Sequence, residues 1–230
     1  MKLGIIGFGN MAEAILGGIL ESGFVNKKDV VASGKDDAML AKASDKYGIG
    51  VQKDNCKVVE DSDVILLSVK PQILAEVISE IKGVCTQDKL IVSIVAGKTQ
   101  EWIANAFGCA HKVVRCMPNT PALVGEGCTG ICFSESVTDD EKVFALKMFN
   151  CVGKAMEVPE KLMDVVVGCI RFSCSFSADL RVRNAYLLEK GKRVHRGSDK
   201  NIFEGLLEIR WLLLADGSVL YGNLQLLDCR

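Results

Sequence analysis

The stretch KLGIIGFGNMA, residues Lys2–Ala12, decides the fold of this chain. It opens with a continuous apolar run, which is typical of a strand buried in a parallel sheet. Gly7, Gly9 and Ala12 then match G-x-G-x-x-G/A, and apolar residues at helical spacing follow. Gly7 permits a tight turn, Gly9 lets the backbone approach a pyrophosphate, and Ala12 keeps helix and strand close. The stretch therefore predicts a dinucleotide-binding turn at a helix N-terminus; a glycine-rich turn that only packs is the alternative.

Apolar strands and amphipathic helices alternate as far as residue 164. This alternation predicts an α/β fold with a Rossmann-type, doubly wound, mainly parallel sheet. We expect a nucleotide-binding domain over residues 1–164 and a short atypical segment over residues 165–230. The expected strands cover residues 2–8, 29–33, 63–69, 89–95, 112–117, 130–133 and 155–158, and the helices after the first cover 37–47, 73–81, 99–106 and 139–149.

Composition indicates a globular protein without a nucleic-acid or membrane partner. The 230 residues carry 28 Lys+Arg against 29 Asp+Glu, a formal net charge of -1, so no basic surface for nucleic acid or anionic lipid is expected. No apolar run approaches the ~20 residues of a membrane-spanning helix. The N-terminus is typical of a strand and not of a signal peptide, and we expect a cytoplasmic protein.

The ten cysteines form no C-x-x-C pair, so neither a zinc site nor a redox dithiol is predicted, and no metal is expected. Most of them lie in apolar surroundings, where a free thiol behaves as a small hydrophobe. We expect buried free thiols in a reducing compartment; a secreted disulfide protein is the alternative.

The end of the second expected strand bears on cofactor choice. NAD sites usually place an acid there to bind the ribose 2′-hydroxyl. This chain has Ser33, Gly34 and Lys35 before its first acid, Asp36. A hydroxyl and a cation suit a 2′-phosphate, so NADP(H) is favoured and NAD(H) stays open. The alternative is that Lys35 is only a solvated loop lysine.

Three further loops follow expected strands, at the sheet edge where ligands bind in open α/β folds. They are Ser68–Pro71, Ser93–Gly97 and Met117–Pro121. The residues before each proline of the third loop are restricted to extended conformations, so this loop is stiff. Asn119 and Thr120 are therefore expected to point an amide and a hydroxyl at a small polar ligand.

Together these motifs resemble those of the pyrroline-5-carboxylate reductases, in register from residue 1 to about residue 168. The block Arg115–Pro121 distinguishes this family from other dinucleotide-binding proteins better than the glycine loop does. The resemblance implies hydride transfer from NAD(P)H to the C=N bond of 1-pyrroline-5-carboxylate, giving L-proline in the last step of proline biosynthesis, by a homo-oligomer. It places Pro118, Asn119 and Thr120 near the nicotinamide and the imino-acid substrate. With Lys35 and Pro71 added from the loops above, the expected cofactor contacts are Gly7, Phe8, Gly9, Asn10, Met11, Ala12, Ser33, Lys35, Asn55, Val69, Lys70, Pro71, Ala96 and Gly97.

No catalytic side chain is assigned. A protonated cyclic imine is already a good hydride acceptor, so the protein mainly holds the nicotinamide against the imine carbon and excludes water. His111 opens a strand and His195 lies among Lys and Arg, so both are expected at the surface.

Residues 169–230 depart from the family, which continues into an all-helical dimerisation domain that begins with SGS(G/A)P and carries a GGTT-type loop. No Gly-Gly or Thr-Thr pair occurs here after Gly168. One possible codon sequence for Ile170–Ser173, read one nucleotide later, encodes SGSA. The same shift in one possible codon sequence for Arg183–Ala185 encodes GMP. A shifted reading frame, an alternative exon or a diverged tail would each explain the departure, and we expect the chain to lack the family's dimer interface.

Two other functions stay open. One is a non-catalytic NADP-binding fragment, which would bind NADPH without turnover of pyrroline-5-carboxylate. The other is a reductase of the β-hydroxyacid dehydrogenase type, which needs a catalytic lysine on a helix beyond the nucleotide domain.

Overall fold

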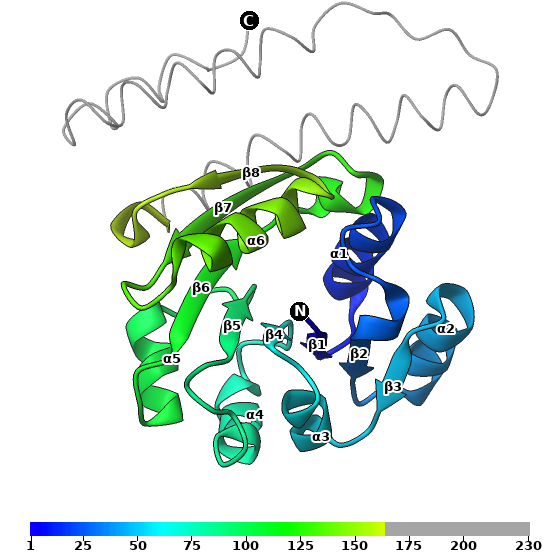
Figure 1. Ribbon diagram of the computed structural model, residues 1–230, viewed down its shortest axis with the longest axis horizontal. Coiled ribbons are helices and arrows are strands. Elements are labelled where there is room, and N and C mark those ends of the chain that lie inside the picture. Colours follow the sequence, from blue (N-terminus) through cyan, green and yellow to red (C-terminus); the bar gives the residue numbers. More distant parts are fainter. Residues whose placement is uncertain (164–230) are drawn as a thin grey trace, which may run out of the picture. The chain divides into compact units, whose positions relative to one another are not determined.

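The computed structural model describes residues 1–163, all within one structural unit. These residues form an eight-stranded sheet with the order β3-β2-β1-β4-β5-β6-β7-β8 (Figure 1). Because β1 has β2 on one side and β4 on the other, the direction of winding reverses at β1. The strands are β1 (Leu3–Ile6), β2 (Val30–Ser33), β3 (Gly50–Gln52), β4 (Val64–Leu67), β5 (Leu90–Ser93), β6 (Lys112–Met117), β7 (Gly127–Phe133) and β8 (Gly153–Glu157).

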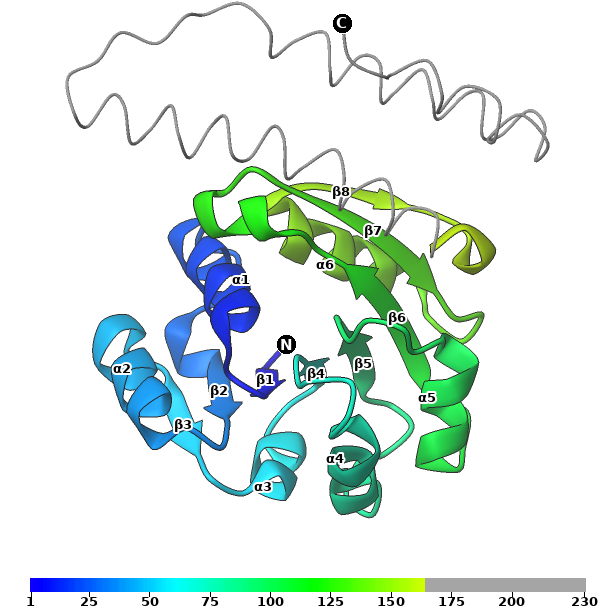
Figure 2. The ribbon, with the colours of Figure 1, turned by 180° about the vertical axis from the view of Figure 1, so that it is seen from behind.

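Helices cover both faces of the sheet, as expected for a doubly wound fold. One buried apolar cluster joins α1, α2 and α6 to the sheet, and a second joins α3, α4 and α5 to it. Figures 1 and 2 show α3, α4 and α5 in a row along one face. The helices are α1 (Asn10–Glu21), α2 (Asp37–Tyr47), α3 (Asn55–Glu60), α4 (Leu74–Ile81), α5 (Gln100–Phe107) and α6 (Asp139–Asn150), with 3₁₀ turns η1 (Lys27–Asp29), η2 (Thr120–Val124) and η3 (Glu160–Leu162).

The Rossmann-type α/β fold predicted for this part of the chain is therefore confirmed, with two differences. First, β7 runs antiparallel to β6, because residues 118–126 between them are too few for a helical crossover. Second, β3 and α3 were not predicted. They span only three and six residues, too short for a periodic pattern to appear.

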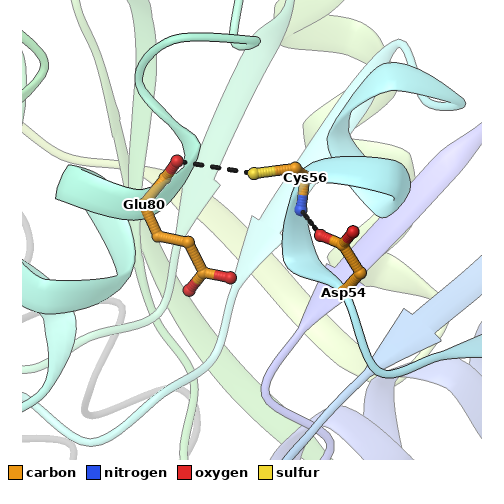
Figure 3. Close-up of side chains that lie close together, drawn as sticks. All are labelled: Asp54, Cys56 and Glu80. Carbon is orange, nitrogen blue, oxygen red and sulfur yellow. Dashed lines mark hydrogen bonds between the residues drawn. The ribbon is translucent and has the colours of Figure 1, made fainter.

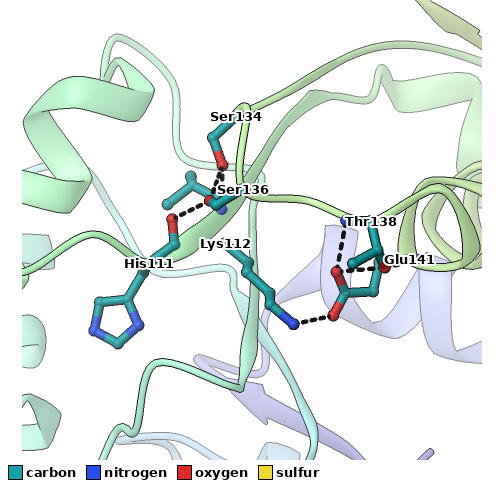
Figure 4. A network of polar contacts seen from close by, with 7 residues as sticks. His111, Lys112, Ser134, Ser136, Thr138 and Glu141 are labelled. Carbon is teal, nitrogen blue, oxygen red and sulfur yellow. Dashed lines mark hydrogen bonds and ion pairs between the residues drawn. The ribbon is translucent and has the colours of Figure 1, made fainter.

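Local sequence signals set most helix ends. Asp36 accepts hydrogen bonds from two N–H groups of the first turn of α2, and Gly48 ends that helix in the left-handed conformation. Thr138 and Glu141 form a reciprocal capping box at α6. Figure 4 shows the Glu141 carboxylate also accepting from Lys112 of β6, at 2.8 Å. This contact ties the start of α6 to the sheet.

The surface position predicted for His111 is wrong: its side chain is only 2% exposed. The imidazole packs on Phe107 with 4.6 Å between ring centroids, and its Nε2 lies 3.2 Å from Cys109 Sγ. Burial lowers the pKa of His111. His195 lies outside the described residues.

The described cysteines agree with the free-thiol prediction. All seven between Cys56 and Cys151 are free, but only Cys85, Cys116 and Cys132 are buried, while the other four are partly exposed. Burial raises the pKa of Cys85 to about 11 and that of Cys132 to about 12, which keeps both thiols protonated. Among residues 1–163, no helix has the length and apolarity needed to cross a bilayer.

Candidate functional site: a dinucleotide crevice

The glycine loop is fixed between the ends of three neighbouring strands. Gly7 has a φ of +88°, and a Cβ there would lie 2.6 Å from Val69 Cγ1 and 3.0 Å from the Ser68 carbonyl oxygen. Its N–H donates to the Ser33 carbonyl at 2.9 Å, and its own carbonyl accepts from the Ser68 hydroxyl. Only glycine fits this position, so the turn after β1 is locked to β2 and β4.

Gly9 is open where Gly7 is crowded. No heavy atom of the described chain would lie within 4 Å of a Cβ built there, apart from its own neighbours. Gly9 is the N-cap of α1 and offers no side-chain cap. α2, α3, α5 and α6 each begin with an Asp or Thr that caps the first turn, whereas α4 also lacks a side-chain cap. No side chain therefore accepts from the N–H groups of the first turn of α1, and the space beside Gly9 is open, which suits a pyrophosphate.

At the end of β2, Ser33 is fully buried. Its hydroxyl donates to Asn55 Oδ1 at 2.6 Å, and Asn55 Nδ2 donates to Glu80 Oε2 at 2.9 Å. Ser33 therefore supports Asn55, and Asn55 is the residue of this pair that is partly exposed. The sequence missed Glu80, since nothing in the pattern of α4 marks which residue will meet Asn55.

Lys35 lies on the exposed loop after β2. Its Nζ is 3.9 Å from Glu76 Oε1 of α4, with both side chains about three-quarters exposed. Such an exposed pair holds little energy, so the ammonium is available to an anion at this edge.

Close to Asn55, Asp54, Cys56 and Glu80 bring three ligand atoms within 4.8 Å of one another (Figure 3). The Asp54 carboxylate accepts from the Cys56 N–H, and Cys56 Sγ donates to the Glu80 carbonyl at 3.4 Å. Burial, and then the Asp54 and Glu80 carboxylates, raise the pKa of the Cys56 thiol. The Cys56 thiol is thus protonated, and Asp54 and Glu80 are exposed. The two hydrogen bonds to backbone groups explain why these three residues lie close together.

At the other end of the crevice lies the loop after β6. Pro118 is buried and Thr120 is exposed at the start of η2. The side chain of Asn119 is nearly buried, and its Oδ1 accepts from the Cys128 N–H of β7 at 2.8 Å. Its Nδ2 is buried and has no hydrogen-bond partner within the described chain. Asn119 thus holds the loop on one side and keeps a free donor on the other.

The predicted site residues gather at one edge of the sheet. The glycine loop follows β1, Ser33 and Lys35 end β2, and Asn55 follows β3. Val69, Lys70 and Pro71 follow β4, Ala96 and Gly97 follow β5, and the loop with Asn119 follows β6. All these strands are parallel neighbours, so their carboxyl ends lie along one edge of the sheet, on both sides of the reversal at β1; we call this candidate site the crevice.

A groove of about 770 Å³ lies elsewhere, near the C-terminal ends of α1 and α2. It is lined by residues including Leu20, Lys27 and Tyr47. It lies at the opposite end of α1 from the glycine loop, and none of the predicted site residues lines it.

The sheet order and the glycine loop after β1 define a Rossmann-type α/β domain. A family model described as "NADP oxidoreductase coenzyme F420-dependent" matches residues 2–97. The chain is 39% identical over 167 residues to a pyrroline-5-carboxylate reductase of Methanosarcina acetivorans, and 38% identical over 167 residues to that of Escherichia coli; each alignment covers 73% of this chain and 62% of the relative. Over the aligned residues the chain is thus similar to pyrroline-5-carboxylate reductases, and it spans about 62% of the length of these curated relatives.

Solved structures agree on the fold. A Coxiella burnetii pyrroline-5-carboxylate reductase matches with a TM-score of 0.73 at 24% identity, over 100% of this chain and 85% of that one. A Plasmodium falciparum pyrroline carboxylate reductase with NADP bound matches with a TM-score of 0.68 at 26% identity, over 94% of this chain and 79% of that one.

Proposed function

We propose that this protein transfers hydride from NADPH to the C=N bond of 1-pyrroline-5-carboxylate, giving L-proline. The proposal is supported by the similarity to pyrroline-5-carboxylate reductases and by the crevice, which carries the polar and glycine positions that such a cofactor needs. The single observation that carries it is the pairing of a crowded, left-handed Gly7 with an open Gly9 at the uncapped start of α1.

These residues fit a nicotinamide dinucleotide from end to end. Gly9 and the first turn of α1 would hold the pyrophosphate, and Asn55 and Lys35 would hold the 2′ end of the adenosine. Ala96, Gly97 and the loop with Asn119 would hold the nicotinamide end. A bound reduced nicotinamide supplies the hydride, while the side chains present orient the reactants and exclude water.

Asn119 has a specific part in this proposal. Its Oδ1 is committed to the backbone of β7, so only Nδ2 is available for a ligand. A buried donor without a partner costs roughly 1–3 kcal/mol, which a ligand carbonyl or carboxylate would recover. The nicotinamide carboxamide and the substrate carboxylate are both acceptors of this kind.

The test combines binding with turnover in the full chain. NADPH should quench or shift protein fluorescence with saturation, and added pyrroline-5-carboxylate should give NADPH oxidation matched by proline. Gly9→Val should weaken NADPH binding roughly 100-fold and lower turnover with it, whereas Gly83→Val, another glycine with open space around it, should leave both unchanged. Absence of saturable NADPH binding in the parent chain would contradict the proposal.

A non-catalytic NADP-binding protein is the second candidate, since the similarity to these relatives extends over only 73% of this chain. We propose that residues 165–230, which lie outside the described residues, do not provide the family's dimer domain. The support is the sequence after Gly168, which lacks the expected motifs. Light scattering on the purified chain tests this: a monomer is expected, and a stable dimer that forms proline at a normal rate would contradict it.

Sequencing the gene across codons 165 to 175 tests whether the reading frame is shifted there.

We also place the protein in the cytoplasm. The support is the set of seven free thiols between Cys56 and Cys151, which fits a reducing compartment. Fractionation with a tagged chain would test this.

A further inference from the structure

We propose that two carboxylates of α4, Glu76 and Glu80, limit the preference of this protein for NADPH over NADH. The inference rests on the proposed function. Each carboxylate engages one of the two residues proposed to read the 2′ position of the cofactor: Glu76 engages the exposed Lys35, and Glu80 engages the partly exposed Asn55.

The placement follows from helix geometry. Glu76 and Glu80 are four residues apart, so both lie on one face of α4. Lys35 comes from the loop after β2 and Asn55 from the start of α3. One helix face thus meets polar groups that follow two adjacent strands, β2 and β3.

The contacts have unequal consequences. Glu76 partly neutralises the Lys35 ammonium across 3.9 Å, in a pair that is open to solvent. Glu80 accepts from Asn55 Nδ2 at 2.9 Å, and an ionised carboxylate can only accept. It therefore directs Nδ2 toward α4 and Oδ1 toward the Ser33 hydroxyl, whose proton is already donated to that oxygen. One Nδ2 hydrogen remains for a ligand, beside a negative charge.

The surroundings of Asn55 are acidic. Cys56, the next residue, has its thiol pKa raised by burial and then by Asp54, Glu80 and Glu60. A 2′-phosphate carries about two negative charges near neutral pH, so it meets repulsion here that a 2′-hydroxyl does not. The α4 carboxylates thus weaken NADPH binding selectively.

The experiment measures dissociation constants of NADPH and NADH for the full chain by titration calorimetry. Glu80→Gln keeps an acceptor for Asn55 and removes the charge. It should tighten NADPH binding about three- to tenfold and change NADH binding less than about twofold. Glu76→Gln should tighten NADPH binding about two- to threefold, because its pair with Lys35 is exposed, and this effect should vanish in a Lys35→Met background.

Glu60→Gln is the matched control. It removes the same charge near Cys56, and no described contact joins its carboxylate to Lys35 or Asn55. The NADPH-to-NADH ratio should stay within about twofold of the parent chain. Ratios unchanged in both α4 variants, or raised equally by Glu60→Gln, would overturn this inference while leaving the proposed function intact. A parent chain that binds neither dinucleotide would overturn the proposed function itself, and this inference with it.

Discussion

The two ends of the crevice differ in how far their polar groups are already satisfied. At the adenosine end, Ser33, Asn55 and Glu80 bond to one another, and Lys35 meets Glu76. At the nicotinamide end, Asn119 keeps a buried Nδ2 without a partner in the described chain. Nearby in η2, the apolar side chains of Leu123 and Val124 are more than half exposed.

This difference separates two tasks. At the end that we propose for the adenosine, a ligand must compete with contacts that already exist. At the end that we propose for the nicotinamide, a ligand would add a hydrogen bond that Asn119 Nδ2 lacks. Changes at the first end should therefore alter which dinucleotide binds, and changes at the second should alter what happens to it.

The largest expected effect comes from the loop that joins both ends. Gly9→Val places a branched side chain where the pyrophosphate approaches the backbone, and should weaken binding of NADPH and NADH alike roughly 100-fold, about 2.7 kcal/mol. Circular dichroism should show an unchanged fold, since open space surrounds this position. A loss confined to one dinucleotide would place the pyrophosphate elsewhere.

A smaller effect is expected at the nicotinamide end. Asn119→Asp keeps the acceptor for the Cys128 N–H but removes the unpaired donor. It should lower kcat about tenfold, the value of one lost hydrogen bond in the reacting complex, with NADPH affinity within about threefold. Steady-state kinetics with proline analysis checks this. A fall in NADPH affinity without a fall in kcat would contradict this prediction, because Asn119 would then contribute to cofactor binding and not to the reaction.

At the adenosine end, Lys35→Glu should narrow the NADPH preference about three- to tenfold, because it loses a charge-assisted phosphate contact that solvent weakens. NADH affinity should hardly change. Equal preferences before and after the substitution would show that Lys35 is a solvated lysine without a role in selection.

The smallest effect concerns a buried group outside the crevice. Burial lowers the pKa of His111 below its ordinary 6.5, so the unfolded chain binds a proton there that the folded chain does not. The contribution of the neutral His111 side chain to stability is therefore complete above pH 6.5, and it is lost as the pH falls through the pKa of His111 in the folded chain. The urea midpoint should fall between pH 7.5 and 5.5, and fall less in His111→Gln. Equal falls in both chains would contradict this.

Features encoded in a few consecutive residues were predictable from the sequence. The β1–α1 turn needs Gly7, Gly9 and Ala12 in order, and the pattern G-x-G-x-x-G/A records this directly. The strand ends that carry Val69, Ala96 and Asn119 were also predictable, since each strand is an apolar run with a clear stop. Whether these residues bind cofactor stays a prediction.

Contacts between distant segments were not predictable. Asn55 and Glu80 meet across 25 residues, and the sequence of α4 only shows that Glu80 lies on a polar face. The position of His111 at the start of a strand suggested exposure, but its ring packs on Phe107 at the end of α5. The antiparallel turn into β7 depends on a short connection, which the alternation of strands and helices does not reveal.

The most direct test of the central claim is a crystal structure of the full chain with NADPH. The account predicts the pyrophosphate against Gly9 and the first turn of α1, the 2′-phosphate beside Lys35 and Asn55, and the carboxamide within hydrogen-bond distance of Asn119 Nδ2 or the adjoining loop. A dinucleotide found instead in the groove lined by Leu20, Lys27 and Tyr47, at the far end of α1, would contradict it.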